Sequence, residues 1–94
     1  MRILIGYDVS TVEPDGAKRL RQISQACKDY GLRVQKSLFE IQLETRHWVE
    51  LKSRLLNIMN LHEDSIRIYY LDQDTKLEHH GTNKPLDLDA PIIL

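Results

Sequence analysis

The spacing of apolar residues changes along the chain from a period of two to a period of three or four. Residues 2–8 alternate, and this predicts a strand with Ile3, Ile5 and Tyr7 on one face. Asp8 lies on the other face, at the end of the expected strand. Residues 12–16 read as a loop, in which Asp15 can cap a following helix.

Two amphipathic helices follow from the longer spacing. The first is expected after the loop and up to about Tyr30, where Gly31 stops it. The second is expected from Thr45, its cap, through Met59. Their apolar stripes are Leu20, Ile23, Cys27 and Tyr30 in the first, and Trp48, Leu51, Leu55, Ile58 and Met59 in the second.

The remaining segments favour extended structure. A long second strand is predicted from Arg33 to Ile41 or Leu43, but Leu38 and Phe39 break its alternation. Residues 38–43 are therefore alternatively a third strand, as half of a hairpin. Residues 66–71 predict a strand and residues 77–80 a short strand ended by Gly81.

Strand–helix–strand–strand–helix–strand is the split βαβ order, written βαββαβ, of an α+β fold with two helices on one face of the sheet. We expect one domain over residues 1–94, with a core at 1–71. Residues 72–94 are expected to be a dimer-completing strand and tail, because an apolar C-terminus can cover an exposed sheet edge of a second copy.

Composition narrows the class of protein. Of 94 residues, 41% are hydrophobic and 29% are charged, which is typical of a soluble globular domain. No apolar run approaches 18 residues and the first residues do not resemble a signal peptide, so we expect no membrane contact. The single cysteine, Cys27, excludes an internal disulfide and fits the cytoplasm.

The formal net charge of −1 hides an uneven distribution. Residues 15–36 are locally basic and residues 60–94 are acidic. The basic part suits phosphate binding, although a solvated helix face explains it equally well. Its basic residues are Lys18, Arg19, Arg21, Lys28, Arg33 and Lys36.

Asp8 is the candidate for chemistry. A lone Asp after a strand is more often a turn former, but here Ser10 and Thr11 follow and the next element is basic. One carboxylate supplies few ligands for Mg²⁺, which usually takes one or two carboxylates plus a substrate phosphate. Two copies of Asp8 facing each other in a symmetric dimer would meet this need. His79 and His80 point to opposite faces of a strand, so we interpret them as structural.

Five ordered motifs resemble the family of small CRISPR-associated adaptation endonucleases, the smaller of the two core proteins that capture new spacers. The motifs are Tyr7–Ser10, Lys18–Arg21, Tyr30–Gly31, Arg33–Glu40 and Asp64–Tyr69. The likeness extends over nearly the whole chain. Lys36 and Leu38 depart from the family pattern, and neither affects the argument for Asp8.

The resemblance implies a ferredoxin-like homodimer whose C-terminal strand packs against the other protomer. It also implies that Asp8 is a Mg²⁺ or Mn²⁺ ligand at the dimer interface, with Tyr7 as the second catalytic residue. The nucleic-acid-binding residues that it implies are Lys18, Arg19, Arg21 and Arg33, and the supporting residues are Ser10, Ser37 and Phe39.

Three functions follow as hypotheses. The first is a metal-dependent endonuclease acting on double-stranded DNA or single-stranded RNA. The second is a non-catalytic scaffold that clamps duplex DNA and bridges dimers of the larger CRISPR integrase protein. The third is a ferredoxin-like RNA-binding or regulatory module, for which Tyr69 is the one obvious exposed aromatic.

Overall fold

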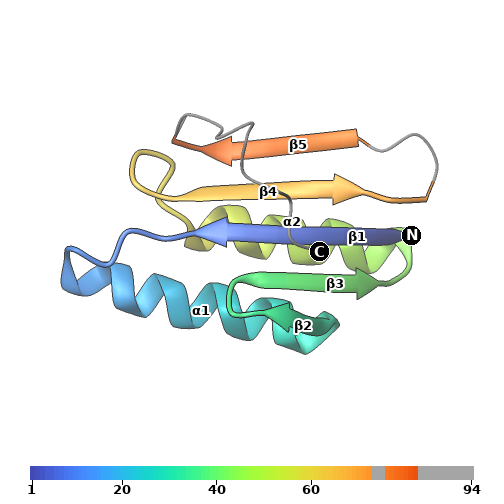
Figure 1. Ribbon diagram of the computed structural model, residues 1–94, viewed down its shortest axis with the longest axis horizontal. Coiled ribbons are helices and arrows are strands. Elements are labelled where there is room, and N and C mark those ends of the chain that lie inside the picture. Colours follow the sequence, from blue (N-terminus) through green and yellow to red (C-terminus); the bar gives the residue numbers. More distant parts are fainter. Residues whose placement is uncertain (73–75, 83–94) are drawn as a thin grey trace.

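Two helices cover one face of an antiparallel sheet in the computed structural model, which describes residues 1–72 and 76–82 (Figure 1). The described strands lie in the order β2-β3-β1-β4-β5. This arrangement confirms the predicted α+β fold. In chain order the elements are β1 (Arg2–Asp8), α1 (Pro14–Tyr30), β2 (Leu32–Gln35), β3 (Leu38–Gln42), α2 (Thr45–Ile58), β4 (Ser65–Tyr70) and β5 (Lys76–Gly81).

The core lies between the sheet and the two helices. Ile3 and Ile5 are fully buried, and Tyr7 is 6% exposed, so the predicted apolar face of β1 is the helix-facing one. Both predicted helix stripes reach this core. The other fully buried members include Ile23, Cys27, Phe39, Ile41 and Leu51.

A hairpin replaces the predicted long second strand. β2 and β3 pair antiparallel around the turn at Lys36 and Ser37, with an irregular register near Gln35. The prediction of one strand over these residues was wrong, and the hairpin alternative is confirmed. The residues of β2 are exposed, so this edge strand lacks the buried face on which a sequence pattern depends.

The N-cap of each helix precedes the predicted cap, by two residues in α1 and by one residue in α2. Glu13 and Glu44 are the N-cap residues, and neither side chain caps its helix by a hydrogen bond. Asp15 lies in the first turn of α1, behind Pro14, whose ring suits the first helical position. Thr45 is itself the first residue of α2. The two predicted caps were therefore wrong, although the helices themselves are confirmed.

Residues 76–81 form the predicted fifth strand, and it pairs with β4 of its own chain. Its end is fixed at Gly81, which has a φ of 102° and whose Cβ, if present, would lie 1.8 Å from the Asp64 carbonyl oxygen. Only glycine fits there. Residues 83–94, to which the remainder of the predicted dimer-completing tail belongs, lie outside the described residues.

Glu78 attaches β5 to the rest of the fold. It accepts a hydrogen bond from the Tyr70 hydroxyl at 2.8 Å and forms ion pairs with Lys52 of α2 and with His80. Burial raises the pKa of Glu78, but the hydrogen bonds from Lys52, His80 and Tyr70 outweigh it and lower the pKa to about 2. Burial and the Glu78 hydrogen bond raise the pKa of Tyr70 to about 12.

This cluster predicts a loss of stability in acid. The folded pKa of Glu78 lies below its ordinary value of 4.5, so its contribution is present above pH 4.5 and is lost as the pH falls toward 2. We expect the melting temperature of the wild type to exceed that of Glu78→Gln at pH 6, and this difference to shrink between pH 4.5 and 2. Thermal melts followed by circular dichroism measure it. Glu50→Gln, exposed on α2, is the control and should show no such pH-dependent difference.

Candidate functional site

Tyr7 and Asp8 leave β1 on opposite faces of the sheet. Tyr7 packs into the helix-facing core, where its ring stacks on Phe39 at a centroid distance of 6.1 Å. Asp8 is exposed and pairs in register with Ser65 of β4. The two predicted catalytic residues are thus neighbours in sequence, and only Asp8 presents its side chain on the face that the helices leave open.

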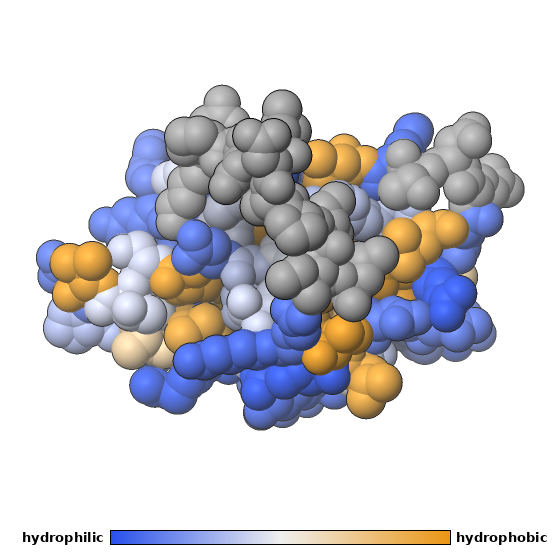
Figure 2. All heavy atoms as spheres, in the orientation of Figure 1, coloured by the Kyte–Doolittle hydropathy of each residue, from blue (hydrophilic) through white to orange (hydrophobic). Residues whose placement is uncertain are grey.

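The helix-free face of the sheet carries polar and apolar residues together. Close to Asp8, the Ser65 hydroxyl is hydrogen-bonded to His79 Nε2 at 2.9 Å. His80 lies on the opposite face and is hydrogen-bonded to Glu78, as the alternation of a strand predicts for adjacent histidines. Figure 2 views this face of the molecule, and orange apolar residues are interspersed with blue hydrophilic ones where the grey atoms leave it visible.

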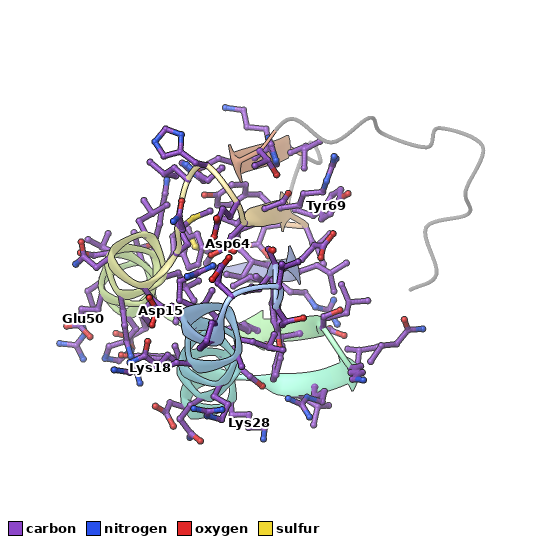
Figure 3. The ribbon with its side chains drawn as sticks, turned by 90° about the vertical axis from the view of Figure 1, so that its left-hand side faces the viewer. Asp15, Lys18, Lys28, Glu50, Asp64 and Tyr69 are labelled. Carbon is purple, nitrogen blue, oxygen red and sulfur yellow. The ribbon has the colours of Figure 1, made fainter. Side chains whose placement is uncertain are left out.

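An apolar row crosses this open face. Leu4, Tyr69 and Leu77 are register partners on β1, β4 and β5, so their side chains lie side by side. Leu77 is half-exposed and Tyr69 is partly exposed. In Figure 3, Tyr69 lies on the side of the sheet away from the helices. Leu4 is only 5% exposed, so Tyr69 and Leu77 are the two members of the row that offer apolar surface for a contact.

A buried ion pair holds the loop that follows Asp8. Asp64 is fully buried and accepts hydrogen bonds from Arg19 Nε at 2.8 Å and Arg19 Nη2 at 3.2 Å. It also accepts from the backbone N–H of Ser10 at 3.3 Å and of Asn60 at 2.8 Å. Arg19 additionally pairs with Glu63. Figure 3 shows Asp64 beside the loop that joins β1 to α1.

Sequence reasoning missed Asp64. Helical spacing sets Arg19 at the margin of the apolar stripe, from which it could reach across the sheet or into a dimer groove, and the family resemblance assigned it to nucleic acid. The Arg19 guanidinium is largely buried against Asp64, and hydrogen bonding to Asp64 raises its pKa. Ser10 contributes through its backbone N–H. No local pattern could have revealed this pair, because its members lie 45 residues apart and Asp64 simply precedes a strand.

A groove of about 640 Å³ runs between α1 and the β2–β3 hairpin and reaches the end of β1. Four cations line it, Arg21 and Lys28 from α1 and Arg33 and Lys36 from the hairpin. Asp8 is the one acidic residue among the described residues that line it. The other lining residues are Tyr7, Val9, Thr11, Leu20, Ser24, Gln25 and Ser37.

Arg33 spans the groove. Its guanidinium lies 5.2 Å above the centre of the Phe39 ring, an arrangement that cation–π attraction favours. Its Nη2 donates a hydrogen bond to the Ser24 hydroxyl on α1. Phe39 is fully buried and supports Arg33 and Tyr7 from below.

The groove gathers five of the nine predicted site residues: Tyr7, Asp8, Arg21, Arg33 and Ser37. Phe39 lies beneath it. Lys18, Arg19 and Ser10 are not among its lining residues. Figure 3 shows Lys18 and Lys28 well separated on α1, and only Lys28 lines the groove. The spacing of Arg21, Gln25 and Lys28 is that of one helix face, whereas the sequence offered the hairpin that closes the groove only as an alternative to one long strand.

Neither a metal cluster nor a reactive thiol complements Asp8 in residues 1–72 and 76–82. No three His, Cys, Asp or Glu side chains come together there as ligands. Burial raises the pKa of the Cys27 thiol to about 12, so it stays protonated at neutral pH. No helix in the described ranges is long and apolar enough to cross a membrane.

Residues 1–78 match the family model described as "CRISPR associated protein Cas2". The chain is 47% identical to a protein of Rhodospirillum rubrum named CRISPR-associated endoribonuclease Cas2 3, over 98% of this chain and 99% of that protein. It is 42% identical to CRISPR-associated endonuclease Cas2 of Halalkalibacterium halodurans, over 99% of each. The crystal structure of Streptococcus pyogenes Cas2 superposes with a TM-score of 0.71 at 44% identity, over 79% of this chain and 89% of that one.

Proposed function

Because this chain belongs to the Cas2 family of CRISPR-associated proteins, we propose that it acts in CRISPR adaptation as a homodimeric, metal-dependent endonuclease. We further propose that it binds double-stranded DNA and bridges dimers of the CRISPR integrase. The place of Asp8 carries the proposal: an exposed carboxylate ends β1 at the rim of a groove lined by four cations. Metal-dependent cleavage of a phosphodiester needs a carboxylate that binds the metal ion and basic side chains that bind the phosphates.

Asp8 suits Mg²⁺ or Mn²⁺ if a second ligand set comes from outside the chain. These hard cations prefer carboxylate and phosphate oxygens, and Mg²⁺ usually takes only one or two protein carboxylates. The described residues offer no cluster of three ligands, so a second Asp8 and the substrate phosphate are the natural complements. When bound, the cation would lower the pKa of a water molecule and stabilise charge on the phosphate.

The other residues of the site would bind the nucleic acid and orient it. Arg21, Lys28 and Lys36 would contact phosphates of the strand, which gives affinity without reading sequence. Arg33 offers a planar, two-pronged donor set for one phosphate. Tyr7 packs under this surface, and its stacking on Phe39 fixes the end of β1 and so the position of Asp8.

The apolar row Leu4–Tyr69–Leu77 supports a homodimer through the open sheet face. Two copies related by a two-fold axis would bury Tyr69 and Leu77, the exposed members of the row, since a symmetric interface uses the same patch twice. Asp8 lies on that same face, so the contact would bring two Asp8 carboxylates into one site. Repulsion between them would be relieved by a shared cation.

The dimer requirement can be separated from Asp8 itself. Tyr69→Glu would place two buried charges at the interface, and we expect the particle mass to fall from two chains to one. Metal-dependent cleavage should be lost although Asp8 is intact. Light scattering after size-exclusion chromatography and a cleavage assay measure the two effects. Val49→Glu, at an exposed position of α2, is the control and should change neither. A monomer that still cleaves would contradict the shared site.

The single carboxylate also favours a second candidate function, the non-catalytic scaffold. A chain that contributes one metal ligand can bind DNA through its cationic groove without binding a metal ion. The two candidates differ in one measurement. The scaffold binds duplex DNA and integrase without cleaving RNA or DNA when Mg²⁺ or Mn²⁺ is added.

A further inference from the structure

We propose that the groove between α1 and the hairpin binds a single unpaired nucleotide, with its phosphate at the cations and its base and sugar over the apolar end. This inference deepens the proposed nucleic-acid function and rests on it. The shared chemistry is one base, one sugar and one phosphate. It could be supplied by a free mononucleotide or by the unpaired end of a strand.

Arg33 provides the phosphate position. Its guanidinium now donates to the Ser24 hydroxyl, a neutral acceptor. A phosphate is a stronger acceptor for a guanidinium and can take two of its N–H groups at once. Arg21, Lys28 and Lys36 line the same groove, so an entering dianion would meet an excess of positive charge.

Tyr7 provides an unsatisfied polar group. The side chain lines the groove, is almost fully buried and stacks on Phe39. Its hydroxyl has no hydrogen-bond partner among the residues that the structure describes. A buried hydroxyl without a partner is unfavourable, and a ligand oxygen or nitrogen entering beside it would remove that cost.

Size and lining favour a nucleotide over a bare phosphate of the backbone. The groove holds about 640 Å³, within the range of small-ligand sites. Val9 and Leu20 make one part of it apolar, while Ser24 and Gln25 supply hydrogen-bonding groups. A surface that only contacts the phosphates of a duplex needs exposed cations. The apolar side chains and the buried Tyr7 hydroxyl of the groove would serve no purpose there. These parts of the groove suit an unpaired base, because such a base can leave the stack and pack against side chains.

Calorimetry with the full chain tests this inference. AMP, CMP, GMP and UMP are titrated separately, with inorganic phosphate and the matching nucleosides as comparison ligands. We expect at least one mononucleotide to bind at least tenfold more tightly than phosphate. Tyr7→Phe removes only the hydroxyl and should weaken that nucleotide about fivefold without weakening phosphate. Arg33→Ala should weaken both about tenfold or more.

Tyr30→Phe is the matched control, because Tyr30 ends α1 and does not line the groove. Its nucleotide affinity should equal that of the wild type. Equal affinity for phosphate and all four nucleotides, or unchanged nucleotide affinity in Tyr7→Phe with its melting temperature preserved, would overturn the inference. If Tyr7→Phe does not fold, Ser24→Ala replaces it. The Ser24 hydroxyl competes with the phosphate for Arg33, so nucleotide affinity should rise at least twofold, and an unchanged or lower affinity would overturn the inference.

Two further arms identify the source and separate this inference from the proposed function. A duplex with a one-nucleotide overhang should compete with the mononucleotide more strongly than a blunt duplex if the ligand is a strand end, and equally if it is a free nucleotide. Asp8→Asn should lower cleavage about a hundredfold or more, whereas nucleotide affinity should not fall, because the change removes a negative charge from the lining of the groove. Nucleotide binding by a wild type that cleaves nothing contradicts the endonuclease but not the groove, and the reverse result contradicts only the groove.

Discussion

Replacing Asp8 with asparagine is expected to lower metal-dependent cleavage of RNA and duplex DNA about a hundredfold or more. Asparagine has the same shape but no charge, so it keeps the surface of β1 and loses the attraction for a divalent cation. In a symmetric site the change removes two carboxylates at once. The effect should therefore be larger than that of any single cation of the groove.

The measurement compares cleavage of single-stranded RNA and of duplex DNA with Mg²⁺, with Mn²⁺ and with a chelator. Mn²⁺ binding, followed by electron paramagnetic resonance, gives a readout independent of turnover and should weaken in Asp8→Asn. Because Asp8 is exposed, the melting temperature should change little. Asp15→Asn, an exposed acid in the first turn of α1, is the control and should keep full activity.

Two results would count against the catalytic role. Cleavage that survives in Asp8→Asn removes this residue from the reaction and indicates a contaminating nuclease. Absence of cleavage in the wild type, together with intact binding to DNA and integrase, favours the scaffold. The relative activities on RNA and DNA also assign the substrate, a point on which the names of the R. rubrum and H. halodurans relatives differ.

Local patterns predicted the parts of the site that lie within one element. Alternation along β1 is enough to place Tyr7 toward the core and Asp8 on the opposite face, because both positions depend only on strand geometry. Helical spacing likewise puts the polar residues Lys18, Arg21, Gln22, Gln25 and Lys28 opposite the apolar stripe of α1, although Lys18 and Gln22 do not line the groove. The family resemblance then added nucleic acid and the CRISPR integrase as expected partners, and it agreed with the metal role that the neighbours of Asp8 already suggested.

Contacts between distant segments could not be predicted in this way. The groove exists because the chain turns at Lys36 and Ser37, and β2 has no buried face that would have favoured the hairpin over one long strand. Arg19 is a basic residue of a helix, as many nucleic-acid contacts are, and only the tertiary structure brings it to Asp64. A buried acid and a basic helix residue far apart in sequence carry no signal of their pairing.

The Arg19–Asp64 pair gives the largest expected effect on stability. Asp64→Ala leaves the Arg19 guanidinium without its main partner in a largely buried position, and it leaves the N–H groups of Ser10 and Asn60 without their acceptor. Removing one member of a buried ion pair typically costs about 3–5 kcal/mol. For a domain of this size we expect the melting temperature to fall by roughly 20 °C.

Glu63→Ala is the matched control, because Glu63 pairs with the same guanidinium from an exposed position. Exposed pairs contribute about 1 kcal/mol or less, so its melting temperature should change by no more than a few degrees. Urea unfolding of both variants gives the free energies. If both variants lose the same small amount of unfolding free energy, water replaces Asp64 as the hydrogen-bond partner of the Arg19 guanidinium. A large loss confined to Asp64→Ala would mean that this pair fixes the loop after Asp8, since Asp64 joins Ser10, α1 and the end of β5 at one point.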